Sequence, residues 1–164
     1  MDNFDKLYNK ALRFLSFRPR SEKELRDYLS GKARSRSARK IVSEESLINS
    51  IIEKLKKDRF LNDEEFTRWW VEQRTLIKPR ACRVIKFELK QKGIAKDLID
   101  SLFENDEGSD FIKALKLAEK KMVRLAKIED KRKVYEKLGR FLASKGFNWD
   151  TIKEVIDQIL KIDK

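Results

Sequence analysis

The stretch Leu89-Lys90-Gln91-Lys92-Gly93-Ile94 decides the fold, because it returns later in the chain as Leu142-Ala143-Ser144-Lys145-Gly146-Phe147. Six residues after each glycine stands an isoleucine, Ile99 or Ile152, and apolar residues follow it three and four positions later. An apolar run that ends at a glycine and resumes at helical spacing predicts two helices joined by a tight turn. A helix–turn–helix unit that recurs along a chain is typical of a repeat protein.

A weaker third copy lies nearer the amino terminus, where Leu25 and Leu29 have the spacing of the paired apolar residues before the later turns. There the next apolar helix arrives late, at 48–52. Apolar residues recur at spacings of three and four almost throughout, and no sustained alternation indicates a strand. The sequence therefore predicts an all-α protein, a tandem array of three three-helix (helix-turn-helix-like) repeats. An extended molecule of this kind is better suited to binding an extended partner than to catalysing a reaction in a pocket.

Caps and helix breakers set the expected limits of the helices. The nine expected helices cover about 4–17, 21–31, 45–57, 62–77, 79–93, 96–104, 111–127, 129–144 and 149–162. They group in threes, which places the repeats at 1–60, 61–106 and 107–164. The segment 32–40 is expected to be a loop, and the acidic segment 105–110 a linker.

Four local signals indicate where helices begin or end. Ser21-Glu22-Lys23-Glu24 has the form of a capping box, in which the Ser21 oxygen accepts from the Glu24 amide and the Glu24 carboxylate reaches back. Gly93 is expected to close its helix in the left-handed conformation, and Asn148 to cap the last helix. Pro79 stands where it could open the fifth helix.

The chain is strongly basic: its 164 residues include 40 lysines and arginines against 28 aspartates and glutamates, a formal net charge of +12. Such an excess favours a polyanionic partner, which is nucleic acid, a nucleoprotein or an anionic membrane. The longest stretch without charged side chains, 46–52, is far too short to span a bilayer, and no secretory segment stands out. We therefore expect a cytoplasmic protein.

No catalytic constellation is visible. Histidine is absent, which removes the usual general base and any histidine-bearing zinc site, and no glycine-rich phosphate loop occurs. Cys82 is the single cysteine, so the chain forms no internal disulfide. Arg80 and Arg83 beside it could lower its pKa, but a small, partly buried residue explains it better than a nucleophile. We expect no enzyme, no metal and no cofactor.

Basic side chains gather in two kinds of place. On the expected fifth helix, Arg83, Lys86 and Lys90 lie about 100–160° from the core residue Ile85 and form one stripe. The matching positions of the first repeat hold Lys23 and Arg26. The segment 32–40 adds five basic residues and no acid: Lys32, Arg34, Arg36, Arg39 and Lys40. These patches suit phosphate contacts, which position a protein without reading sequence.

Trp69 and Trp70 are adjacent on the expected fourth helix and so point about 100° apart. One of them is expected in the core. The other could stack on a base or a protein partner, and we favour a role in sealing the junction between repeats.

Short motifs along the chain resemble one protein family. Arg18-Pro19-Arg20-Ser21-Glu22-Lys23-Glu24-Leu25, with the following Leu29, resembles the opening signature of the RecX proteins. Further similarity lies in Phe60-Leu61-Asn62-Asp63-Glu64-Glu65-Phe66, in Arg74 and in Glu88-Leu89-Lys90-Gln91-Lys92-Gly93-Ile94. The resemblance covers almost the whole chain in order and spacing, and the third repeat matches by pattern more than by motif.

The resemblance implies a cytoplasmic bacterial regulator of the RecA recombinase in DNA repair and recombination. Members of that family look like curved arrays of three-helix units that lie in the groove of the RecA–DNA filament, where they suppress ATP hydrolysis, strand exchange and filament growth. The implied partners are the RecA filament and single- and double-stranded DNA without sequence preference. A membrane is not among them, and a monomer is expected.

The stripes, the basic segment and the basic residues of the family motifs make up the expected contact surface for DNA or the filament. Its candidate residues are Arg18, Arg20, Lys23, Arg26, Lys32, Arg34, Arg36, Arg39, Lys40, Arg74, Arg80, Arg83, Lys86 and Lys90. The chain departs from the family pattern at the long basic segment, and at Asp58-Arg59 and Lys78-Pro79-Arg80, where turns with glycine are common.

Two other classes fit the sequence. A stand-alone helix-turn-helix protein would place one recognition helix in a major groove and prefer a consensus site, but no helix offers an evident set of base-reading side chains. A helical adaptor would bind protein only, with its charge serving solubility. Footprinting on random duplexes separates the first class from a filament regulator, and binding in the absence of DNA separates the second.

Overall fold

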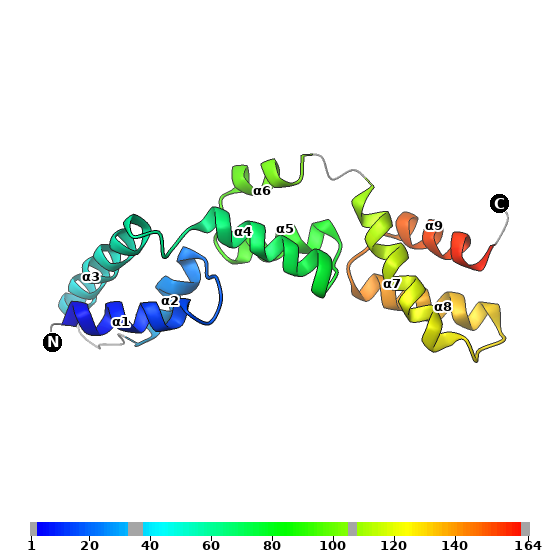
Figure 1. The fold of residues 1–164 in the computed structure, drawn as a ribbon, viewed down its shortest axis with the longest axis horizontal. Coiled ribbons are helices and arrows are strands. Elements are labelled where there is room, and N and C mark those ends of the chain that lie inside the picture. Colours follow the sequence, from blue (N-terminus) through cyan, green and yellow to red (C-terminus); the bar gives the residue numbers. More distant parts are fainter. Residues whose placement is uncertain (1–2, 33–37, 105–107, 162–164) are drawn as a thin grey trace. The chain divides into compact units, whose positions relative to one another are not determined.

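The structure, a computed structural model, describes residues 3–32, 38–104 and 108–161, without the side chains at 32 and 38–44. Its elements are α1 (Asn3–Leu15), α2 (Glu22–Lys32), α3 (Ala38–Lys57), α4 (Asp63–Glu72), the π-helical turn η1 (Gln73–Ile77), α5 (Cys82–Gln91), α6 (Lys96–Leu102), α7 (Ser109–Leu125), α8 (Lys131–Ser144) and α9 (Trp149–Leu160) (Figure 1). These described ranges contain helices and turns and no strand, which confirms the all-α prediction.

Two predicted helix starts are wrong. Helix α3 begins at Ala38, so the expected loop 32–40 contains the last residue of α2 and the first turn of α3. The segment 38–44 has no glycine or proline, and alanine, arginine and lysine favour a helix there. Helix α5 begins at Cys82, so Pro79 does not open it. Pro79 instead stops η1, because the residue before a proline is driven out of the helical conformation, and Lys78 has φ −127° and ψ 71°.

The chain packs into two compact units, of which the first comprises Met1–Trp70 and Leu89–Leu98. Helices α1, α2 and α3 surround one core, and Figure 1 shows α1 beside α2 and α3. Its buried apolar side chains include Leu61, which follows α3, and seven residues on the predicted helical faces: Ala11, Leu25, Leu29, Ile48, Ile51, Ile52 and Leu55. The expected apolar register of the first repeat is therefore confirmed.

The second unit comprises Val71–Glu88 and Ile99–Lys164. Helices α7, α8 and α9 all pack against one another (Figure 1). The core between them includes the predicted Leu138, Leu142, Ile152, Val155 and Ile156. Three apolar helical faces that meet in this way bury what no single helix could bury alone.

The predicted turn at Gly93 is confirmed, with a left-handed φ of 78°. The N–H of Ile94 donates to the carbonyl of Leu89 at 3.1 Å, the bond that closes a Schellman turn after a helix. A Cβ atom at Gly93 would lie 2.8 Å from Cβ of Lys23, so the neighbouring helix leaves no room for a side chain. Gly146 ends α8 in the same way, with φ 92°.

Arg59 occupies the corresponding turn after α3 and is left-handed without being glycine, with φ 60°. The N–H of Phe60 donates to the carbonyl of Leu55 at 2.8 Å, which again closes a Schellman turn. The backbone thus keeps the turn that glycine usually supplies, at the cost of a left-handed arginine.

Candidate nucleic-acid interface

The start of α2 is built by the predicted capping box. The N–H of Glu24 donates to Ser21 Oγ at 3.2 Å, and the N–H of Ser21 donates to Glu24 Oε2 at 3.4 Å. A further acceptor comes from the start of α4, where Asp63 Oδ1 takes the N–H of Glu22 at 2.7 Å. Burial raises the pKa of Asp63, and this backbone bond acts in the opposite direction. The capping box is therefore confirmed, and Asp63 adds a cap from a distant helix.

Glu24 also binds two cations that lie over tryptophan rings. Arg18 NH2 lies 2.9 Å and Lys92 Nζ 2.6 Å from Glu24 Oε1. The Arg18 guanidinium lies 5.6 Å from the ring centre of Trp69, and Lys92 Nζ lies 4.5 Å from that of Trp70. Both indoles are half-buried, so the prediction that one of them is a core residue is wrong. They form a platform for cations that are held by a carboxylate.

The single carboxylate of this cluster is shared by two cations. Burial of the Glu24 carboxyl acts to raise its pKa, but hydrogen bonds from Arg18 and Lys92 outweigh burial, and the pKa lies below its usual value. Glu24 is thus ionised at neutral pH and pairs with both cations. Arg18 is a predicted filament contact, but its guanidinium group forms an ion pair within the protein.

Arg20 is held by an aromatic ring. Its guanidinium carbon lies 4.1 Å from the ring centre of Phe14, a cation–π distance. Its Nε atom is buried and makes no hydrogen bond with the described residues. Burial, with the nearby charge of Arg18, lowers its pKa. The side chain is therefore half-buried against α1, and only part of it can meet a partner.

The stripe predicted on the first repeat makes contacts within its own unit. Lys23 Nζ donates to the carbonyl of Gln91, the last residue of α5, at 2.9 Å. Arg26 Nε donates to Glu22 Oε1 at 2.8 Å, and its NH1 donates to Asn49 Oδ1 at 2.6 Å. A cation at a helix carboxyl end satisfies a carbonyl that has no partner inside the helix. These two side chains hold helices together.

Arg80 and Arg83 perform the same task in the second unit. Arg80 NH1 donates to the carbonyl of Ser144 at 2.8 Å, and Arg83 Nε donates to the carbonyl of Gly146. Ser144 is the last residue of α8, and Gly146 lies in the turn that closes this helix. Arg83 occupies the position in its repeat that Lys23 has in the first, so both equivalent cations bind the end of a helix from elsewhere in the chain.

The remaining candidate cations on this part of the chain differ in how far they are bound by other groups of the protein. Arg74 Nε forms an ion pair with Glu88 Oε2 at 2.7 Å, and both side chains are about three-quarters buried. Lys86 Nζ lies 5.0 Å from the ring centre of Phe103. Lys90 is exposed and is free of hydrogen bonds and ion pairs with the described residues. The predicted stripe on α5 thus contains one unengaged cation.

The basic segment contributes the other candidates. The side chains of Lys32, Arg34, Arg36, Arg39 and Lys40 lie outside the described residues. They stay predicted contacts.

Sequence reasoning missed a polar cluster around Cys82. The Cys82 N–H donates to Asp110 Oδ1 at 2.8 Å, and its thiol donates to the same oxygen at 2.9 Å. Lys113 Nζ lies 3.0 Å from the Cys82 sulfur and 3.6 Å from Asp110, although Lys113 is only 8% exposed. Asp110 stands in the first turn of α7 as Asp63 does in α4, and a comparison of the expected repeats at that position would have found both caps.

Neither a metal centre nor a membrane span emerges from the part of the chain that the structure describes. No group of three carboxylates or thiols there could hold a metal ion. No helix among the described residues has the length and apolar character needed to cross a membrane. What the arrangement offers is a basic surface and helix-to-helix polar contacts.

Comparison with known proteins gives matches along the whole chain. Three family models match in order: "RecX, first three-helix domain" at residues 8–38, "RecX, second three-helix domain" at 62–101 and "RecX, third three-helix domain" at 109–156. The regulatory protein RecX of Clostridium perfringens strain SM101 is 38% identical over 160 residues, which cover 96% of this chain and 70% of that protein. That of Clostridium tetani is 33% identical and covers 99% and 71%.

A solved structure agrees with these matches. The crystal structure of RecX from Lactobacillus salivarius superposes with a TM-score of 0.70 at 27% identity and covers 97% of each chain. Its likeness supports the tandem three-helix architecture that the sequence predicts.

Proposed function

Because the chain belongs to the RecX family of regulatory proteins, we propose that it regulates the RecA recombinase, mostly negatively, by binding in the groove of the RecA–DNA filament. Bound there, it suppresses ATP hydrolysis, strand exchange and filament growth. The observation that carries the proposal is the ordered match of three RecX domains along one chain. Repeated helical units suit a partner that is itself a repeating polymer.

The net charge of +12 supports a DNA-containing partner, since cations that neutralise phosphates release counterions and gain affinity. We place the phosphate contacts on the basic segment 32–40 and on Lys90. Arg18, Arg20 and Arg83 serve mainly to hold the fold, because their guanidinium groups already bind a carboxylate, a ring or a carbonyl. DNA contact of this kind positions the protein without sequence preference.

We also propose that the protein acts as a monomer in the cytoplasm and performs no catalysis itself. The repeating subunits of a filament already supply successive binding sites, so a protein that binds along the filament needs no second copy of itself. Regulation then follows from occupancy of the filament.

The test is ATP hydrolysis by RecA filaments preformed on single-stranded DNA, followed while this protein is added in increasing amounts. The proposal predicts that hydrolysis falls at amounts well below one molecule per RecA subunit, and that strand exchange falls in parallel. A helical protein of similar net charge from outside the family serves as the control. If that control inhibits equally, or if hydrolysis is unchanged, the regulator function is wrong.

A further inference from the structure

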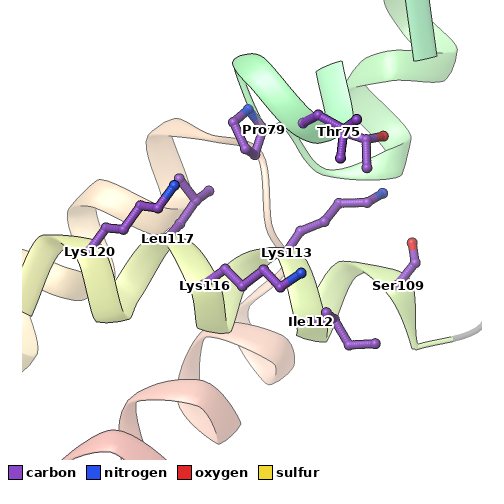
Figure 2. Close-up of a pocket in the computed structure, with 9 residues that line it drawn as sticks. Thr75, Pro79, Ser109, Ile112, Lys113, Lys116, Leu117 and Lys120 are labelled. Carbon is purple, nitrogen blue, oxygen red and sulfur yellow. The ribbon is translucent and has the colours of Figure 1, made fainter. Parts of the chain in front are cut away.

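A cleft of about 350 Å³ lies in the second unit, between α7 and the chain that precedes α5 (Figure 2). Figure 2 shows Thr75 and Pro79 on one side and the side chains of α7 on the other. Its apolar lining consists of Leu76, Pro79, Ile112 and Leu117. Its volume lies at the lower end of the range of ligand-binding clefts, which is about 300–1,000 Å³.

Three lysines line this cleft: Lys113, Lys116 and Lys120. Their spacing of three and four residues places them on one face of α7, where like charges repel one another. Lys113 is matched by Asp110, 3.6 Å away. Lys116 and Lys120 are exposed and form no ion pair with the described residues, and no carboxylate lines the cleft. The cleft therefore carries positive charge that its own lining does not balance.

Apolar side chains at the cleft are exposed as well. Leu76 is 68% and Ile112 is 55% exposed, although both are large and apolar. Removing such surface from water is favourable. A partner that fits this surface must bring apolar groups together with negative charge.

We propose that this cleft binds an acidic peptide segment of a partner protein, with an apolar side chain against Leu76, Ile112 and Leu117 and carboxylates beside Lys116 and Lys120. Nucleic acid fits less well. No aromatic side chain lines the cleft for a base to stack on, and a phosphate would leave the apolar lining uncovered. The proposal goes beyond filament regulation, because it assigns a protein-binding site that does not depend on DNA.

The probe is a fluorescein-labelled peptide of about twelve residues, made of glutamates with two leucines one helical turn apart. Fluorescence anisotropy should give a Kd of roughly 1–100 μM for the full chain. The double substitution Lys116→Glu/Lys120→Glu should weaken binding at least tenfold. Lys127→Glu/Lys131→Glu is the matched control, since it changes the net charge equally at exposed residues of the same unit, and it should change Kd less than twofold.

A second variant tests the apolar half of the site. Ile112→Ser should weaken binding at least threefold, as should a peptide with serines in place of both leucines. Circular dichroism melts of all variants check that they fold. The proposal is overturned if the peptide fails to bind, if the control pair loses as much affinity as the test pair, or if a short oligo(dT) competes with the peptide and loses its own affinity through the same variants.

Discussion

Arg18 illustrates how a basic residue can have a structural task in a strongly basic protein. Its NH1 and NH2 donate to the two oxygens of Glu24 at 3.3 and 2.9 Å, the paired geometry of a guanidinium and a carboxylate. Lys92 adds a third bond to the same carboxylate. A substitution at Arg18 therefore tests the fold before it tests any partner.

Removal of the Glu24 charge should destabilise the protein in a pH-dependent way. The Glu24 pKa lies below its usual value in the folded protein, so the unfolded chain binds more protons there and stability falls as pH falls through this range. Glu24→Gln should lower the free energy of unfolding at pH 7 by about 2 kcal/mol, as expected for hydrogen bonds to a charged group. The difference from the wild type should shrink as pH falls through the lowered pKa of folded Glu24, because the Glu24 side chain then becomes neutral in the folded state as well.

Urea denaturation followed by tryptophan fluorescence at pH 7 and at about pH 2.5, well below the usual pKa of a glutamate, measures this difference. Glu119→Gln removes an exposed carboxylate without an ion pair to the described residues, and should change stability by less than about 0.5 kcal/mol. An equal loss for Glu24→Gln at both pH values would contradict the assigned ion pairs.

Arg59 offers a gain in stability. A non-glycine residue in the left-handed conformation, such as Arg59, costs about 1–2 kcal/mol of stability. Glycine avoids this strain, but it loses more conformational entropy on folding, which offsets part of the stabilisation. Arg59→Gly should therefore stabilise the protein by about 0.5 kcal/mol. Thermal melts compare it with Lys57→Gly, which places glycine at the last residue of α3 and should destabilise by less than about 1 kcal/mol. A change in stability of the same sign for both variants would contradict the left-handed conformation of Arg59.

At the scale of helices, the same joint is built twice. A carboxylate from the first turn of one helix, Asp63 or Asp110, accepts the N–H at the start of another helix. A cation near that start, Lys23 or Arg83, donates to a carbonyl at the end of a third helix. Each joint thus satisfies backbone groups at both kinds of helix end, where the helix itself leaves them without partners.

The turn after α8 should not tolerate a side chain. Gly146 has φ 92°, and a Cβ atom there would overlap the side chain of Val84. Gly146→Ala should lower stability by about 3 kcal/mol, through backbone strain and overpacking together. Gly31→Ala is the matched control, because Gly31 is helical and a Cβ there meets nothing within 4 Å. It should stabilise by about 0.5 kcal/mol. Thermal melts decide, and similar melting temperatures for both variants would contradict the close packing at Gly146.

For the whole molecule, apolar periodicity sufficed to predict the helical class, the order of helices and the glycine turn at Gly93. It could not predict which cations are engaged. The bond from Lys23 to Gln91 joins residues far apart in the chain, and a helical wheel of α2 shows only that Lys23 lies off the core face. The platform of Trp69 and Trp70 was missed for the same reason, since the cation at Trp70 comes from Lys92.

The basic charge of the whole molecule predicts how its affinity for DNA depends on salt. If about five phosphates are contacted on duplex DNA, log affinity should fall with log salt at a slope of about −4.5. Arg34→Ala/Arg36→Ala/Lys90→Ala should make that slope shallower by about 2.7 if all three residues contact phosphate. The matched control is Lys6→Ala/Lys10→Ala/Arg13→Ala, which removes three exposed cations of α1 and should leave the slope nearly unchanged. Equal changes would mean that overall charge, and no defined surface, meets the DNA.

The most direct test of the central claim is binding to a preformed RecA–single-stranded DNA filament beside bare DNA at the same salt, with ATP hydrolysis followed in the same tubes. We expect tighter binding to the filament than to bare DNA, together with falling hydrolysis. Equal binding to bare DNA with unchanged hydrolysis would contradict it, and would leave a helical DNA-binding protein that does not regulate RecA.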